Sequence, residues 1–282
     1  MRWAVIGSTG LFGQDLLAFL KDNGQDVEGF NRTNLQLSAE PQEIAPQLAG
    51  FDVWVNCVGF TRVDEAEAEV YEANLVNGIY AGALAESAEM AGSRFIQIST
   101  DYVFDGLSGV PYTVTDSINP QTSYGRSKAL GEQLVSESGA DYSILRTAWL
   151  YGSNGHCFPK VVAKSLKRNG TVRVVCDQRG QPTWTRDLAE IVFHVAQLEE
   201  MPRVFNAVAS GQATWAEFAK EVAISIGLSV NSVEEISSDE FPTAARRPVW
   251  SVLDNSNDVL KSIGDWRARW YEAAPEVLRN LT

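Results

Sequence analysis

Near the start of the chain, residues 2–13 read RWAVIGSTGLFG, an apolar run that leads directly into three closely spaced glycines. Residues 2–6 have the length and composition of a buried β-strand. Residues 11–22 have helical spacing, with one apolar face made of Leu16, Leu17, Phe19 and Leu20. A glycine at a strand exit permits a tight turn, a second lets the backbone approach a pyrophosphate, and a third lets the helix pack closely on the sheet. The pattern predicts a dinucleotide-binding loop, with a purely structural turn as the alternative, and its glycines are Gly7, Gly10 and Gly13.

The first half of the chain repeats this alternation of short apolar runs and longer amphipathic stretches. Such an alternation is typical of βα units that build a parallel sheet. Strands are expected at residues 2–6, 26–30, 52–58, 94–98 and 142–146, and helices at 11–22, 66–91 and 123–138. The predicted fold class is therefore α/β, a doubly wound parallel sheet of the Rossmann type.

After about residue 150 the alternation weakens. Helices are expected at 157–168, 186–199, 214–227 and 267–280, with a short strand at 171–175. We therefore predict a dinucleotide-binding domain over residues 1–151 and a smaller C-terminal substrate-binding lobe mainly over 152–282. Residues 186–206 could return to the first domain.

The composition is that of an ordinary globular chain, with 282 residues, 45% hydrophobic and 21% charged. A net charge of −13 is opposite to the basic surface of nucleic-acid-binding proteins, so nucleic acid is not an expected partner. Three cysteines without CxxC spacing predict no disulfide framework, and no cluster has the spacing of metal ligands. The sequence contains neither a signal-peptide core nor 18 uninterrupted apolar residues. We therefore expect no membrane segment and a cytoplasmic location.

The end of the second predicted strand bears on which nicotinamide cofactor binds. An acidic residue there would hydrogen-bond the adenosine ribose, but this chain has Phe30-Asn31-Arg32. Asn31 cannot repel a 2′-phosphate as a carboxylate would, and Arg32 could pair with one bidentately. We expect NADPH, with NADH as the alternative if Arg32 only stacks on the adenine or faces solvent.

Tyr124 and Lys128 form a candidate proton-transfer pair, because residues four apart lie on one face of a helix. The pKa of a free phenol is near 10. An ammonium about 4 Å away, at an effective dielectric constant near 20, would supply the roughly 4 kcal/mol needed to bring that pKa towards 7. We therefore predict that Lys128 lowers the pKa of Tyr124. Thr100 follows the predicted strand 94–98, at the sheet edge where such folds bind ligands.

Several longer stretches, spread over nearly the whole chain, resemble the dTDP-4-dehydrorhamnose reductase family of the extended short-chain dehydrogenase/reductase superfamily. They are residues 55–67, 99–106, 124–132, 146–152, 180–183, 209–211 and 245–248 with Leu253-Asp254. The resemblance implies a Rossmann domain with a small substrate lobe. It also implies NAD(P)H-dependent reduction of the 4-keto group of a nucleotide-linked 6-deoxyhexose, dTDP-4-dehydro-L-rhamnose, to dTDP-L-rhamnose.

The resemblance also implies roles for individual residues. Thr100 would orient the substrate oxygen, Tyr124 would exchange its proton, and Lys128 would hold the nicotinamide ribose. The other expected cofactor contacts, besides Tyr124 and Lys128, are Gly7, Gly10, Leu11, Phe12, Gly13, Asn31, Arg32, Gly59, Phe60 and Thr61. The sugar would be bordered by Val63, Thr100, Asp101 and Trp149.

The chain departs from the family pattern in two places. Cys57-Val58-Gly59-Phe60 stands where the family often has Ala-Ala-Ala-His, and Cys157-Phe158, preceded by His156, stands where Asn-Phe is usual. The second departure leaves another nucleotide-linked 4-ketosugar open as the substrate. A noncatalytic regulatory role, as in the methionine adenosyltransferase beta subunit that resembles this family, also stays open. A homodimer stays open, as does a divalent ion that bridges subunits through scattered carboxylates.

Overall fold

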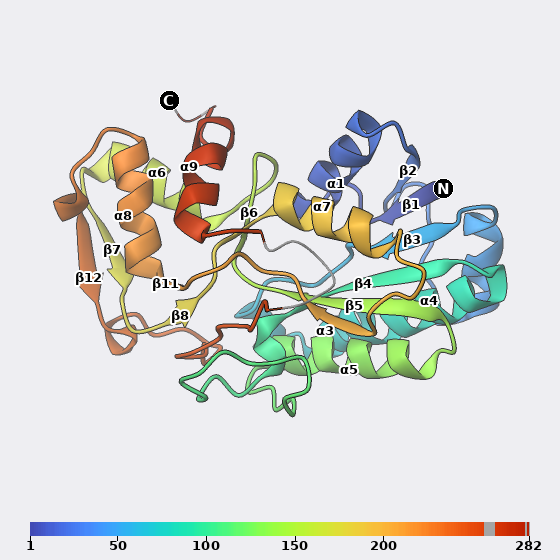
Figure 1. Cartoon of the computed structure of the whole chain (residues 1–282). Coiled ribbons are helices and arrows are strands. Elements are labelled where there is room, and N and C mark those ends of the chain that lie inside the picture. The colour runs from blue at the N-terminus through green and yellow to red at the C-terminus, as the bar shows by residue number, and fades with distance from the viewer. Residues whose placement is uncertain (257–262, 280, 282) are drawn as a thin grey trace.

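The centre of the molecule is a six-stranded, wholly parallel sheet. We describe it from a computed structural model that covers residues 1–256, 263–279 and 281. The strand order is β10-β5-β4-β3-β1-β2 (Figure 1). The strands are β1 (Arg2–Ile6), β2 (Asp26–Phe30), β3 (Val53–Asn56), β4 (Arg94–Thr100), β5 (Asp141–Thr147) and β10 (Val204–Asn206). The strand order changes direction at β1, with β2 on one side of it and β3 on the other. Doubly wound sheets bind their ligands in the crevice at such a point. The predicted Rossmann-type fold class is confirmed.

Helices cover both faces of this sheet. The helices α1 (Leu11–Asp22) and α7 (Thr185–Val195) lie on one face, and α4 (Tyr80–Ala91) and α5 (Ser123–Glu137) lie on the other (Figure 1). A short α2 (Pro41–Ile44) packs beside α4. Side chains of β1 alternate between the two cores, because Trp3 and Val5 pack with α1 and α7 while Ala4 and Ile6 pack with α4.

The long helix expected at residues 66–91 is wrong as a single element. The structure has a 3₁₀ turn (Glu65–Glu67), α3 (Val70–Asn74), a five-residue π-helix (Leu75–Ile79) and then α4. A π-helix is rare and often marks a functional site. At Gly78, an added Cβ would lie 2.6 Å from Leu130 of α5. The missing side chain therefore lets the two helices pack closely.

The second lobe is built on three helices, which are α6 (Phe158–Asn169), α8 (Trp215–Ser225) and α9 (Trp266–Val277). Its strands form three separate pairs: β7 (Val172–Val175) with β12 (Val233–Ile236), β8 (Arg179–Gly180) with β11 (Ala213–Thr214), and β6 (Leu150–Tyr151) with β9 (Thr183–Trp184). An aromatic core holds these pieces together, formed by Tyr151, Phe218, Trp266 and Trp270. The lobe lies beside the sheet at its carboxyl edge (Figure 1).

Residues 186–206 run back to the first lobe. Leu188 and Val192 of α7 pack in the same core as Leu16 of α1, and β10 pairs with β5 at the sheet edge. The sequence pattern did not predict β10, because its three residues are too short to show periodicity. The division of the chain near residue 151 stays a prediction.

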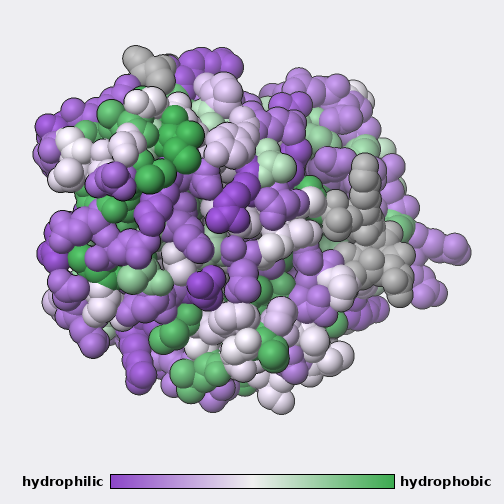
Figure 2. Space-filling model, turned by 60° about the vertical axis from the view of Figure 1, so that its left-hand side comes forward, coloured by the Kyte–Doolittle hydropathy of each residue, from purple (hydrophilic) through white to green (hydrophobic). Residues whose placement is uncertain are grey.

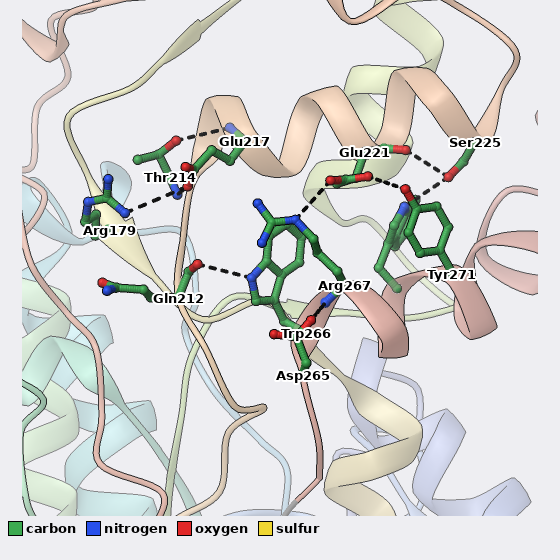
Figure 3. A network of polar contacts seen from close by, with 11 residues as sticks. Arg179, Gln212, Thr214, Glu217, Glu221, Ser225, Asp265, Trp266, Arg267 and Tyr271 are labelled. Carbon is green, nitrogen blue, oxygen red and sulfur yellow. Dashed lines mark hydrogen bonds and ion pairs between the residues drawn. The ribbon is translucent and has the colours of Figure 1, made fainter.

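Polar contacts join α8 to α9 in the second lobe (Figure 3). Thr214 and Glu217 form a capping box at the start of α8. Arg267 donates from Nε to Glu221 over 3.0 Å, and Trp270 donates from Nε1 to Ser225 Oγ over 3.0 Å. These contacts fix the end of α8 against α9.

Hydrophilic side chains cover most of the face shown in Figure 2, and hydrophobic ones gather in separate patches, one of them at the upper left.

None of the helices in the described part of the chain combines the length and apolar character that crossing a membrane requires.

Candidate active site

Two close backbone approaches and a glycine N-cap shape the loop after β1. Gly7 has φ +87°, and an added Cβ would lie 2.8 Å from the Val58 amide nitrogen in the segment that follows β3. A Cβ on Gly13 would lie 2.3 Å from the Gly7 carbonyl oxygen. Gly10 is the N-cap of α1 and contributes no side chain that could occupy the first-turn amides. The loop therefore has the cradle that a pyrophosphate needs at a helix N-terminus.

The side chains of two further residues of this loop pack into the apolar cores of the protein. Phe12 is buried in the core under α1, so only its backbone is available to a cofactor. Leu11 packs against the core of the second lobe, and its atoms would lie 3.5 Å from a Cβ on Gly155. The loop thus also joins the two lobes.

The end of β2 presents one polar turn and one open cation. Asn31 Oδ1 accepts hydrogen bonds from the amide and the hydroxyl of Thr33, at 2.8 and 2.7 Å. Arg32 is exposed and makes no hydrogen bond or ion pair within the described residues. Its guanidinium is therefore available to an added phosphate.

The segment after β3 is held in place by Asn77, which lies in the π-helix. Asn77 Oδ1 accepts from the Phe60 amide at 2.8 Å, and its Nδ2 donates to the Phe60 carbonyl at 3.0 Å. The same Nδ2 lies 2.8 Å from Ser127 Oγ on α5. Gly59 and Thr61, on either side of Phe60, are exposed. Sequence reasoning missed Asn77, and the one signal in the sequence is an asparagine set among the apolar residues of a predicted helix.

Thr100, Tyr124 and Lys128 meet above the end of β4. Thr100 Oγ1 donates to Asp101 Oδ1 at 2.9 Å and accepts the Tyr102 amide at 3.2 Å. Tyr124 hydrogen-bonds with the Thr100 side chain. One turn further along α5, Lys128 Nζ donates to the Ile98 carbonyl over 2.5 Å. The structure therefore brings together the three predicted catalytic side chains.

The lysine also ties this group to the crevice beside the glycine loop. Lys128 is 6% exposed and interacts electrostatically with Cys57, which follows β3. Cys57 backbone atoms lie within about 3 Å of a Cβ placed on Gly7. Through Cys57, the glycine loop and the proton-transfer residues thus lie near one another at the carboxyl edge of the sheet.

The predicted lowering of the Tyr124 pKa is wrong. Burial raises the pKa of Tyr124 to about 12, although its hydrogen bond with Thr100 acts in the opposite direction. Burial lowers the pKa of Lys128 to about 8, while Glu132 and Cys57 oppose that shift. A phenol in this range stays protonated at neutral pH, so Tyr124 is suited to donate a proton.

The pKa of Asp101, which accepts a hydrogen bond from Thr100, is also shifted. Asp101 is 3% exposed, and burial raises its pKa from 3.8 to about 6. A raised pKa adds stability that is complete below the unfolded value and is lost as pH rises through the folded value. The stability that Asp101 contributes therefore falls between about pH 4 and 6.

We predict that Asp101→Asn removes this dependence. Asn can still accept the hydrogen bond from Thr100. The free energy of unfolding of the parent, minus that of the variant, should decrease by about 1 kcal/mol between pH 5 and pH 8. Urea unfolding at both pH values measures this difference. A constant difference would show that Asp101 keeps an ordinary pKa.

Trp149 is held in an unusual conformation. Its φ is +46°, the single positive value among the described non-glycine residues. Its indole stacks on that of Trp215 with centroids 3.5 Å apart, and a Cβ on Gly180 would lie 2.4 Å from the ring. One face of Trp149 is therefore covered by an aromatic ring that sequence reasoning did not predict.

A cavity of about 760 Å³ opens between the two lobes. Most of its wall comes from the second lobe, including Phe158 and Trp215, and Asp64 reaches it from the segment after β3. Val63, a predicted sugar contact, precedes Asp64 and is partly exposed. The cavity has the volume typical of sites for small molecules.

The histidine and cysteine before α6 differ in burial. Cys157 is buried, with its thiol 3.7 Å from the Gly152 carbonyl, whereas His156 is exposed. Among residues 1–256, 263–279 and 281, no three His, Cys, Asp or Glu side chains converge as metal ligands would.

An ion pair between the lobes lies at the rim of this cavity. Arg247 donates from Nη1 and Nη2 to the two Asp64 oxygens, at 3.0 and 2.6 Å. The Ala245 amide donates to Asp64 Oδ1 at 3.0 Å. The hydrogen bonds from Arg247 hold the pKa of Asp64 below its usual value.

Comparison with known proteins finds similarity over the whole chain. The model of the RmlD substrate binding domain family matches residues 1–282. A probable dTDP-4,6-dihydroxy-2-methyloxan-3-one 4-ketoreductase of Streptomyces antibioticus is 34% identical, covering 99% of this chain and 96% of that protein. A dTDP-4-dehydrorhamnose reductase of Burkholderia thailandensis is also 34% identical, covering 95% of this chain and 96% of that protein. The crystal structure of dTDP-4-dehydrorhamnose reductase from Bacillus anthracis in complex with NADP is similar at a TM-score of 0.89 and 30% identity, covering 96% of this chain and 98% of that one.

Proposed function

The chain belongs to the RmlD substrate binding domain family, and on this basis we propose that it reduces the 4-keto group of dTDP-4-dehydro-L-rhamnose, with NADPH as the reductant, to give dTDP-L-rhamnose. The observation that carries the proposal is the meeting of Thr100, Tyr124 and Lys128 at the carboxyl end of β4. Proton-transfer groups at this edge of a doubly wound sheet stand where a ligand in the crevice can reach them.

The residues of the crevice fit a dinucleotide. Backbone at Gly7, Gly10 and Gly13 leaves room for a pyrophosphate at the start of α1, where no side chain caps the amides of the first turn. Gly59–Thr61 and Lys128 would border the nicotinamide half of the molecule. A reduced nicotinamide bound there would supply a hydride, that is one proton with two electrons, to carbon 4 of the sugar.

The side chains of this protein would manage the proton. Tyr124 is protonated at neutral pH, and its phenol would donate to the ketone oxygen as that oxygen gains negative charge. Thr100 would hold the same oxygen with its hydroxyl. Lys128 would place a positive charge nearby and would stabilise the phenolate that remains. The carbonyl thereby becomes a hydroxyl, with its carbon-bound hydrogen from the reductant and its proton from Tyr124.

Arg32 tests the choice of cofactor. We expect Arg32→Ala to weaken NADPH binding about tenfold and NADH binding less than twofold, because a bidentate contact to phosphate contributes about 1.5 kcal/mol or more. Titration of each cofactor by calorimetry measures both affinities. Lys21→Ala, another basic residue of this lobe, is the matched control. Equal losses for the two cofactors would rule out a contact with the 2′-phosphate.

A second candidate substrate is another nucleotide-linked 4-ketosugar. The Streptomyces antibioticus relative, named a 4-ketoreductase for a different sugar, is as similar to this chain as the dehydrorhamnose reductase of Burkholderia thailandensis. The comparison to make is the kcat/KM for dTDP-4-dehydro-L-rhamnose against that for dTDP-4-keto-6-deoxy-D-glucose. A higher value for the second compound would transfer the proposal to the second candidate. No turnover of either, with intact NADPH binding, would favour a regulatory subunit.

Two expectations about the protein in the cell stay predictions. A cytoplasmic location can be checked by fractionation. A homodimer can be checked by light scattering of the purified protein, with the mass compared to the 30.9 kDa of one chain.

A further inference from the structure

The ion pair between Asp64 and Arg247 lies where the large cavity adjoins a smaller pocket. Both residues line the cavity of about 760 Å³, one from each lobe. Arg247 also lines a smaller pocket together with Tyr102, whose ring packs edge-to-face on Tyr124 with centroids 5.6 Å apart. The pair therefore lies between the large cavity and the catalytic tyrosine.

A nucleotide sugar brings a diphosphate into this space, and the diphosphate needs cations. Within the described residues, the cations that line the cavity are Arg173, Arg246 and Arg247. Arg173 already pairs with Glu234 and Glu240, at 3.3 and 2.8 Å. The guanidinium fork matches a diphosphate bidentately, as it matches a carboxylate.

The remaining two arginines differ in how they are engaged. Arg246 is exposed and makes no hydrogen bond or ion pair in the part of the chain that the structure describes. Arg247 gives both terminal nitrogens to Asp64. The side chains of Arg247 and Asp64 remain 25% and 42% exposed, so an anion in the cavity can reach the pair.

We propose that Arg247 exchanges its partner during the reaction cycle. Asp64 holds Arg247 at the rim of the cavity in the empty protein, and the diphosphate of the substrate replaces Asp64 as the partner of Arg247. The inference rests on the proposed function, because a nucleotide sugar supplies the diphosphate. Asp64 then lowers the affinity for nucleotides and keeps the lobes joined when the cavity is empty. If the ion pair only held the lobes together and stayed intact in the complex, Asp64 would instead raise the affinity for nucleotides.

The test measures binding of three probes by calorimetry, without turnover. The probes are dTDP, thymidine, which lacks the phosphates, and NADPH, whose own diphosphate belongs to the glycine loop. Asp64→Asn keeps an oxygen for the Ala245 amide and removes the charge that competes for Arg247. We expect it to tighten dTDP binding about fivefold, the size expected for a partly exposed ion pair. Thymidine and NADPH should change less than twofold.

Two further variants keep the test decisive. Arg247→Gln should weaken dTDP binding at least tenfold, and Asp64→Asn added to it should have no further effect. Glu190→Gln removes one negative charge from an exposed site on α7 and should leave dTDP binding unchanged. It therefore corrects for the net charge of −13.

Two outcomes of the dTDP measurements would contradict the exchange. If Asp64→Asn weakens dTDP binding as Arg247→Gln does, Arg247 stays on Asp64 in the complex and the exchange is wrong. The exchange is also wrong if Asp64→Asn tightens dTDP binding equally in the Arg247→Gln background. Because these are binding measurements, they are separate from the assay of ketosugar reduction, and failure of the proposed activity would appear only in that assay.

Discussion

Tyr124→Phe is expected to lower kcat for ketosugar reduction by about 10²–10⁴, the range that general acid catalysis contributes. The phenol hydrogen-bonds with Thr100 and has a pKa of about 12, so it carries a proton that the reduced oxygen can take. Phenylalanine keeps the ring that packs on Tyr102. Steady-state kinetics and NADPH titration, run in parallel, separate loss of chemistry from loss of cofactor.

The matched control for this prediction is Tyr142→Phe. Tyr142 is a partly buried tyrosine of β5 that packs against Arg203, away from the crevice. The kcat of the Tyr142→Phe variant should stay within twofold of that of the parent protein. A Tyr124→Phe variant that keeps kcat within a few-fold, with normal NADPH affinity, would show that another group is the proton donor.

Arg146→Met is expected to destabilise the fold by about 3–5 kcal/mol, because it leaves a buried carboxylate without its cation. Arg146 and Glu132 have side chains only 5% and 6% exposed, and they are joined by contacts of 2.7 to 3.2 Å. Ser99 also donates to Glu132, at 2.5 Å. The pair ties α5, which carries Tyr124 and Lys128, to β5. Urea unfolding gives the free energy directly.

Arg173→Met provides the comparison. Arg173 has two carboxylate partners but is 53% exposed, so its loss should cost less than about 1 kcal/mol. Similar losses for the two variants would mean that burial does not set the energy of the Arg146 pair.

The fold of the first lobe could be predicted because its pattern is local. Residues 2–6 and 26–30 match β1 and β2, and residues 11–22 match α1. The π-helix around Asn77 could not be predicted, because its cause lies in packing against α5, about 50 residues away. Local spacing cannot register such a contact.

The same distinction between local pattern and distant contact holds for the site. The proximity of Thr100, Tyr124 and Lys128 could be predicted, because Tyr124 and Lys128 have helical spacing and Thr100 follows a strand; their catalytic roles stay a prediction. The direction of the Tyr124 pKa could not, because two residues on one helix were weighed without the burial that dominates both. The stacking of Trp215 on Trp149 and the pair of Asp64 with Arg247 join residues far apart in sequence, so they were visible only in three dimensions.

One measurement tests the central claim most directly. Purified protein is mixed with dTDP-4-dehydro-L-rhamnose and NADPH, the absorbance of the reduced nicotinamide is followed, and the product is identified by NMR. We predict that one NADPH is oxidised for each dTDP-L-rhamnose formed, and that the rate depends on Tyr124. Binding of NADPH without any oxidation, or oxidation without formation of dTDP-L-rhamnose, would contradict the account.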